Sequence, residues 1–75
     1  MSKEIQNKKQ ERFKRLATYR TNKVLKRLKV LGNCANRSAY VYNREDIDKI
    51  FNVINQKVKE VKSKFHFPKE KEFKL

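Results

Sequence analysis

The chain has 75 residues and a formal net charge of +13, because 21 lysine and arginine residues outnumber 8 acidic residues. A chain of this length forms one small domain at most and leaves little room for an active-site cleft with its supporting residues. A single cysteine, Cys34, excludes an internal disulfide. The apolar runs are short and no signal-peptide pattern follows the first residues, so we expect a cytoplasmic protein with no membrane partner.

Most of the positive charge lies in the first 31 residues, which contain eleven lysines and arginines and two acids, a net charge of +9. Cations gathered on one element are typical of proteins that bind polyanions. A coding sequence rich in A and T would also favour lysine. It would favour Glu and Asp as well, however, and these are sparse before residue 44. The charge distribution therefore predicts a polyanionic partner.

Residues 1–11 are predicted to be a polar, basic N-terminal extension, frayed or ordered by a partner, of a helix at about residues 12–31. Two stripes follow this helix at steps of three and four residues, which return to the same helix face. The apolar stripe consists of Phe13, Ala17, Val24, Leu28 and Leu31. The basic face, about half a turn away, consists of Arg12, Arg15, Tyr19, Asn22, Lys26 and Lys29, with Lys8 and Lys23 beside it. Gly32 is predicted to end the helix in the left-handed conformation.

Arg20 falls at the angular position of the apolar stripe. Its long side chain can extend past the edge of a packed core to reach water. Alternatively, a polar residue within an apolar stripe can fix the register between helices, as in coiled coils. The sequence leaves both roles open.

Residues 32–43 are predicted to be a connector, because asparagine and serine are frequent there. Tyr40 and Tyr42 lie two positions apart in a segment expected to be extended, so they share one side. They have two possible roles, which are to cover the open end of a helical hairpin or, together with Arg37, to contact a ligand.

A second helix is predicted at about residues 44–66. Asn43 is a favoured N-cap residue, and Asp46 follows in the capping-box position. Pro68 disfavours helix in the residue before it, so the helix is expected to end near residues 65–67. Residues 68–75 are predicted to be a charged, mobile tail.

The second helix carries an apolar seam at alternating steps of four and three residues, typical of a coiled-coil heptad. The apolar seam consists of Ile47, Phe51, Ile54, Val58, Val61 and Phe65. Two helices with complementary apolar faces predict an all-α fold, an antiparallel two-helix hairpin. A hairpin of this size leaves half its seam open, so we expect self-association into a homo-oligomeric helical bundle through this seam.

Few residues point to catalysis or metal binding. Cys34 and His66 have no partners at the spacing of a metal site or a catalytic dyad. A single glycine excludes a glycine-rich phosphate loop. We therefore expect a protein that is not an enzyme and holds neither a metal nor a cofactor.

The sequence predicts a small basic nucleic-acid-binding protein with an accessory or architectural role, bound mainly through phosphates. The predicted contact residues are Arg12, Arg15, Tyr19, Asn22, Lys23, Lys26, Lys29, Arg37, Tyr40 and Tyr42. The connector is too long for a helix-turn-helix, so sequence-specific recognition is not predicted. DNA and RNA are not distinguished.

The alternative is a non-catalytic protein-interaction module or inhibitor that binds an acidic protein surface, because the basic face and the open seam would equally suit an acidic protein or a ribonucleoprotein. A third possibility, a basic amphipathic helix on anionic lipid, is disfavoured. The apolar seam already offers the first helix a partner, and the chain has no tryptophan to anchor it at a membrane interface.

Overall fold

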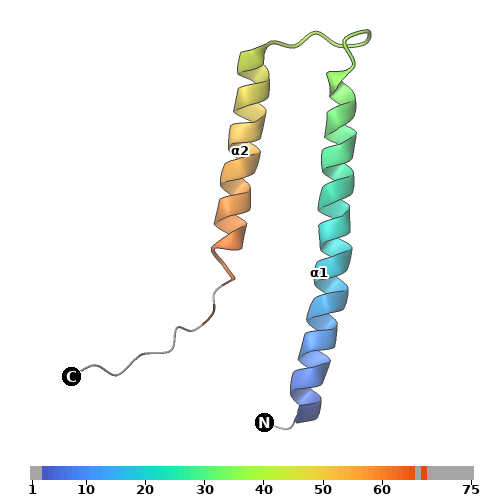
Figure 1. Cartoon of the computed structure of the whole chain (residues 1–75), viewed down its shortest axis with the longest axis vertical. Helices are drawn as coiled ribbons and strands as arrows, with labels where there is room; N and C mark the ends of the chain where they lie inside the picture. Colours follow the sequence, from blue (N-terminus) through green and yellow to red (C-terminus); the bar gives the residue numbers. More distant parts are fainter. Residues whose placement is uncertain (1–2, 66, 68–75) are drawn as a thin grey trace, which may run out of the picture. The chain divides into compact units, whose positions relative to one another are not determined.

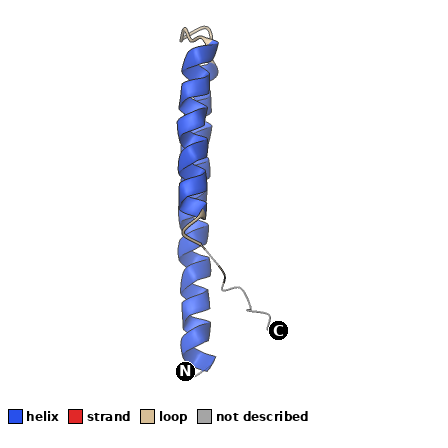
Figure 2. Ribbon diagram, turned by 90° about the vertical axis from the view of Figure 1, so that its left-hand side faces the viewer, coloured by secondary structure: helices blue, strands red, loops and turns tan. Residues whose placement is uncertain are grey.

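The computed structural model describes residues 3–65 and 67, which form two α-helices joined by a 3-10 helix and a loop (Figure 1). The elements are α1 (Lys3–Gly32), η1 (Asn33–Ala35) and α2 (Arg44–Lys62). Both α-helices run without a break, and no strand occurs in the described residues (Figure 2). The all-α class is therefore confirmed. The chain divides into two compact units, Met1–Val41 and Tyr42–Leu75, which are described separately.

The first helix begins earlier than predicted. It starts at Lys3, so residues 3–11 continue the helix that the sequence pattern placed at about residues 12–31. This segment contains neither glycine nor proline, and lysine, glutamate and glutamine have good helix propensity. The apolar periodicity begins only at Phe13, which is why the pattern did not reveal the earlier turns.

The end of α1 differs from the prediction, because Gly32 does not adopt the left-handed conformation. Its φ is −59° and its ψ is −24°, which is right-handed helical geometry. The chain continues as the 3-10 helix η1 and leaves helical geometry at Asn36, whose ψ of 104° is extended. The N–H of Asn36 donates to the carbonyl of Asn33 at 3.4 Å, as in a 3-10 turn. Gly32 thus serves as an ordinary helical residue.

Replacing Gly32 by alanine is expected to stabilise the helix by about 0.4–1 kcal/mol, because the unfolded chain then has fewer conformations to lose. A Cβ built on Gly32 meets nothing within 4 Å, so no steric cost opposes the gain. Thermal unfolding followed by circular dichroism at 222 nm measures the effect. A lower melting temperature for Gly32→Ala would show that this residue needs the left-handed conformation in solution.

The loop is organised by Asn36. Its side-chain Oδ1 accepts from the Ser38 N–H at 3.0 Å, and its carbonyl accepts from the N–H groups of Ala39 and Tyr40 at 3.1 and 3.0 Å. Such a side chain replaces a backbone partner and closes a turn locally. The irregular part of the connector is therefore shorter than the predicted residues 32–43.

The start of α2 is the predicted one. The side chain of Asn43 accepts from the Asp46 N–H at 2.8 Å, and its backbone is extended, as an N-cap requires. Glu45 and Asp46 lie in the first turn, where the helix dipole favours negative charge. This arrangement gives the acidic residues a sufficient structural role.

Replacing Asn43 by alanine is expected to lower the free energy of unfolding by about 1 kcal/mol, because one helix N–H is then without its acceptor. A matched control is Asn52→Ala, which makes the same change within α2 at an exposed position. There alanine is the better helix former, so a small gain is expected. Urea unfolding of the two variants measures both effects, and equal shifts would contradict the capping role.

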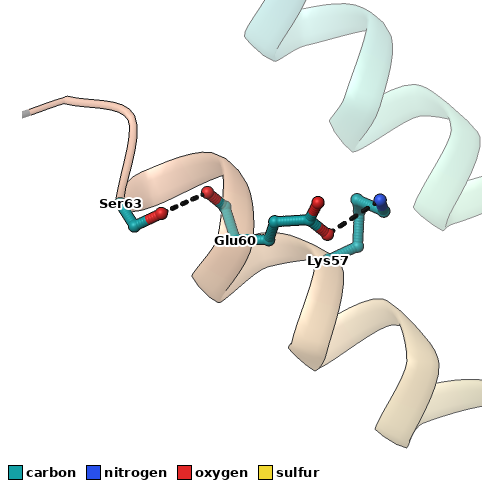
Figure 3. A network of polar contacts seen from close by, with 3 residues as sticks. All are labelled: Lys57, Glu60 and Ser63. Atoms are coloured by element: carbon teal, nitrogen blue, oxygen red, sulfur yellow. Dashed lines mark hydrogen bonds and ion pairs between the residues drawn. The ribbon is translucent and has the colours of Figure 1, made fainter.

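The second helix ends at Lys62, several residues before the predicted end (Figure 3). The Ser63 hydroxyl donates to the Glu60 carbonyl at 2.6 Å, and the Lys64 and Phe65 N–H groups donate three residues back at 3.1 Å each. These bonds satisfy the last carbonyls in a tightened turn. Pro68 and the predicted tail at residues 68–75 lie outside the described residues.

Five residues of the apolar seam lie on one side of α2 by their spacing, whereas Phe65 lies beyond the end of the helix. Phe65 therefore does not follow the helical spacing of the other seam residues, and its part in self-association stays a prediction. Ile47 and Ile54 are half-buried, and Phe51, Val58 and Val61 are exposed. Among the residues that the structure describes, none of these five is fully buried, so the seam is an apolar face of α2.

Candidate nucleic-acid interface

The basic face lies along one uninterrupted helix. Steps of three and four residues keep its six members on one side of α1, and all six side chains are exposed. Arg12 and Lys29 mark its ends, about 25 Å apart at ~1.5 Å of rise per residue. A single rigid element therefore holds four cations, a tyrosine and an asparagine in one line.

The apolar stripe occupies the opposite side of the same helix. Its residues differ in exposure: Ala17 and Leu31 are half-buried, and Phe13, Val24 and Leu28 are exposed. Packing through this stripe would leave the basic face free, since the two are about half a turn apart. The two faces of α1 are thus suited to separate tasks.

Tyr19 and Lys23 form a contact that the sequence pattern did not predict. The Lys23 Nζ lies 5.3 Å from the centroid of the Tyr19 ring, within the range of a cation–π interaction. The two residues are four positions apart, so they are neighbours on the helix surface. The sequence pattern predicted Tyr19 and Lys23 only as separate contacts with a ligand. Their spacing of four positions is the feature that could have indicated the contact between them. The contact draws Lys23 towards the middle of the basic face.

The N-terminal end of the basic face contains a shallow hollow of about 290 Å³, lined by Lys8, Glu11, Arg12 and Arg15. Three cations and one carboxylate share this space, so its net charge is positive. The sequence pattern did not predict that Glu11 would line this part of the site. It follows from helical spacing, because it lies three residues after Lys8 and four before Arg15.

The basic face is not neutralised from within. Among the side chains that the structure describes, none of its cations forms an ion pair with a carboxylate. An ion pair does form on α2, where the Lys57 Nζ lies 2.8 Å from the Glu60 Oε2 (Figure 3). A polyanion can therefore approach the basic face without displacing a carboxylate of the described chain.

The three predicted contact residues of the connector do not lie on α1. Arg37 and Tyr40 follow η1 within the same compact unit, and both are exposed. Tyr42 is half-buried and begins the second unit. The structure thus brings together seven of the predicted contact residues on α1, and the choice between covering and contact roles for the tyrosines stays a prediction.

Neither a metal centre nor a membrane span is found in the described part of the chain. No group of three or more His, Cys, Asp and Glu side chains gathers within residues 3–65 and 67. No helix in the same residues is long and apolar enough to cross a membrane. Cys34 is an exposed free cysteine.

No protein-family model matches the chain, and no curated protein or solved structure is significantly similar to it. Its function is therefore inferred from its own residues.

Proposed function

We propose that this chain is a small, basic, non-catalytic nucleic-acid-binding protein that uses the basic face of α1 as its main contact surface. One observation carries the proposal: an unbroken helix of 30 residues presents its cations along one line, exposed and free of ion pairs within the described side chains. The role is accessory or architectural and cytoplasmic, and it needs neither a metal nor a cofactor.

The physical basis is the release of counterions from the nucleic acid. Duplex DNA carries one charge per ~1.7 Å of its axis, so a face about 25 Å long lies beside about fifteen phosphates. Four cations can neutralise only some of them, and each contact releases condensed counterions. Affinity should therefore depend strongly on salt and weakly on base sequence, because phosphate contacts carry no sequence information.

We also propose that α1 and α2 pair as an antiparallel hairpin through the apolar stripe and the apolar seam. The stripe runs from Phe13 to Leu31, which spans as many positions as α2 has residues, 19. The preceding turns of α1 carry the charged and polar residues of the extension and no continuation of the stripe. This match in length supports pairing over the full length of α2, and self-association of two hairpins would cover the remaining apolar surface.

The assembly and the binding surface are compatible in this proposal. Because the basic face is opposite the apolar stripe, helix pairing buries the stripe and leaves the cations in water. A self-associated form would carry one basic face per chain. Two faces on one particle strengthen binding when both can engage the same strand.

An acidic protein surface, alone or within a ribonucleoprotein, is the second candidate partner. The same exposed and unpaired cations support it, since carboxylates bind lysine and arginine as phosphates do. The nucleic-acid proposal ranks first because a tyrosine and an asparagine lie between the cations, and these side chains can also contact bases.

Purification in low salt tests the proposal. The chain has three tyrosines and no tryptophan, so its own absorbance at 280 nm is weak and bound nucleic acid dominates the spectrum. We expect a high ratio of absorbance at 260 to 280 nm that falls after nuclease digestion, with DNase and RNase identifying the polymer. A low ratio together with one acidic protein that co-purifies in stoichiometric amount would favour the second candidate.

A further inference from the structure

Tyr19 occupies the middle of the basic face. Arg15 lies one turn before it and Asn22 three residues after it, and Tyr19 is 60% exposed. The Lys23 ammonium lies over its ring at 5.3 Å from the centroid. An exposed aromatic ring thus lies between cations at the centre of the basic face. Under the proposed function, this face follows a phosphate backbone.

A duplex makes little use of such a ring. In duplex nucleic acid the faces of the bases are already stacked on one another, and a side chain reaches only base edges and phosphates. In a single strand the bases can be splayed out and stacked on aromatic side chains, while neighbouring cations hold the backbone. Aromatic residues interleaved with cations are the arrangement that suits unpaired bases.

We propose that Tyr19 is a stacking platform for an unpaired base, and that the preferred ligand of this face is a single-stranded segment of DNA or RNA. This inference rests on the proposed function and names its ligand class. The base stacks on the ring face away from Lys23, and the flanking cations bind the phosphates on either side. Every base has a π face, so the platform tolerates any sequence.

The contact with Lys23 contributes by preorganisation. A cation–π contact between residues four positions apart restricts the Tyr19 side chain before any ligand arrives, which lowers the entropy cost of binding. Lys23 is therefore a positioning residue for the ring as well as a cation for the backbone.

The test compares three probes of equal length by fluorescence anisotropy: a 20-nucleotide oligo-dT, a 20-nucleotide oligo-U and a 20-base-pair duplex. Tyr19→Leu removes the ring but retains an apolar side chain and a good helix former. From the energy of base–aromatic stacking, we expect affinity for the two single strands to fall about 5- to 150-fold. Affinity for the duplex is expected to change less than about twofold, since the phosphate contacts remain.

Tyr19→Phe is the matched variant, because it keeps the π face and removes only the hydroxyl. It is expected to bind the single strands far more tightly than Tyr19→Leu does. Circular dichroism checks that the helical signal of each variant equals that of the parent. Oligo-dT and oligo-U differ in the sugar and in the C5 methyl group of the base, so a difference in affinity between them is assigned to the sugar only if oligo-dU binds as oligo-dT does.

Tyrosine fluorescence gives a second measurement that does not depend on affinity. With Tyr40 and Tyr42 both replaced by phenylalanine, Tyr19 is the single tyrosine of a chain that has no tryptophan. Titration with oligo-dT should quench its emission, and titration with the duplex should leave it largely unchanged.

The proposed function and the stacking role of Tyr19 fail differently. A parent chain that binds none of the three probes overturns both together. A parent that binds them, with Tyr19→Leu weakening the single strands and the duplex equally or weakening neither, overturns the stacking role alone. Preference of the parent for the duplex over both single strands also overturns it.

Discussion

Replacing four cations of the basic face by glutamine is expected to lower the salt dependence of nucleic-acid binding by about three units on a single strand and up to about four on duplex DNA. The four cations are Arg12, Arg15, Lys26 and Lys29. Removing one phosphate contact lowers the slope of log K against log salt by ~0.9 for duplex DNA, or by ~0.7 for a single strand. All base sequences should weaken alike, because phosphates carry no sequence information. The helical circular dichroism signal should persist, since glutamine is a good helix former.

A matched control removes the same charge from the rest of α1. It replaces two lysines and two arginines whose helical positions lie more than about 100° from the centre of the basic face, namely Lys9, Lys14, Arg20 and Arg27. Each variant has four fewer positive charges than the parent, so any difference between them reports position and not net charge. The control should weaken binding through the long-range field but change the salt slope much less. Equal salt slopes for the two variants would show that the basic face is a solvated surface with no special role in nucleic-acid binding. That result would favour the acidic-protein candidate.

The presence of two helices and the residues that share the basic face could be predicted from the sequence, because both follow from local spacing. A step of three or four residues fixes a helix face whatever the rest of the chain does. The same locality made Asn43 predictable as an N-cap, since its acceptor role involves only the N–H of Asp46, 2.8 Å away.

The helix ends were harder to predict because several residues can end or continue a helix at similar cost. Gly32 is compatible with both the left-handed and the right-handed conformation, and the structure adopts the right-handed one. At the end of α2, the Ser63 hydroxyl donates to the Glu60 carbonyl and the helix ends at Lys62, well before Pro68 in the sequence. No apolar periodicity marked the first turns of α1, which begins at Lys3.

Within the candidate site, the cations were predictable and the contact between Tyr19 and Lys23 was not. Membership of a face depends on backbone position alone, whereas a ring–ammonium contact depends on the rotamers of two flexible side chains. The pairing of the helices is a different kind of question, because it depends on contacts between residues distant in sequence. The heptad pattern predicts that the apolar seam packs against an apolar face of another helix, but it does not identify that helix.

Val58→Asp is expected to abolish self-association and to lower the free energy of unfolding by on the order of 3–5 kcal/mol, because packing the apolar seam would bury an unpaired charge. In the single chain Val58 is 56% exposed. If nothing covered the seam, the same substitution would change stability by no more than about 0.5 kcal/mol, as at other surface positions. The size of the effect therefore measures whether the seam is covered in solution.

Val53→Asp is the matched control, since it makes the same substitution on the same helix about a third of a turn from the apolar seam. Val53 is 67% exposed, close to Val58, so the two substitutions differ mainly in the face they charge. Sedimentation velocity at micromolar concentration gives the association state, and thermal unfolding gives the stability. A parent chain that sediments as a folded monomer would remove the bundle, while a large destabilisation by Val58→Asp in that monomer would still support the hairpin. Equal, small effects of both variants would show that nothing covers the apolar seam of α2 in solution. The proposed function would then rest on α1 alone.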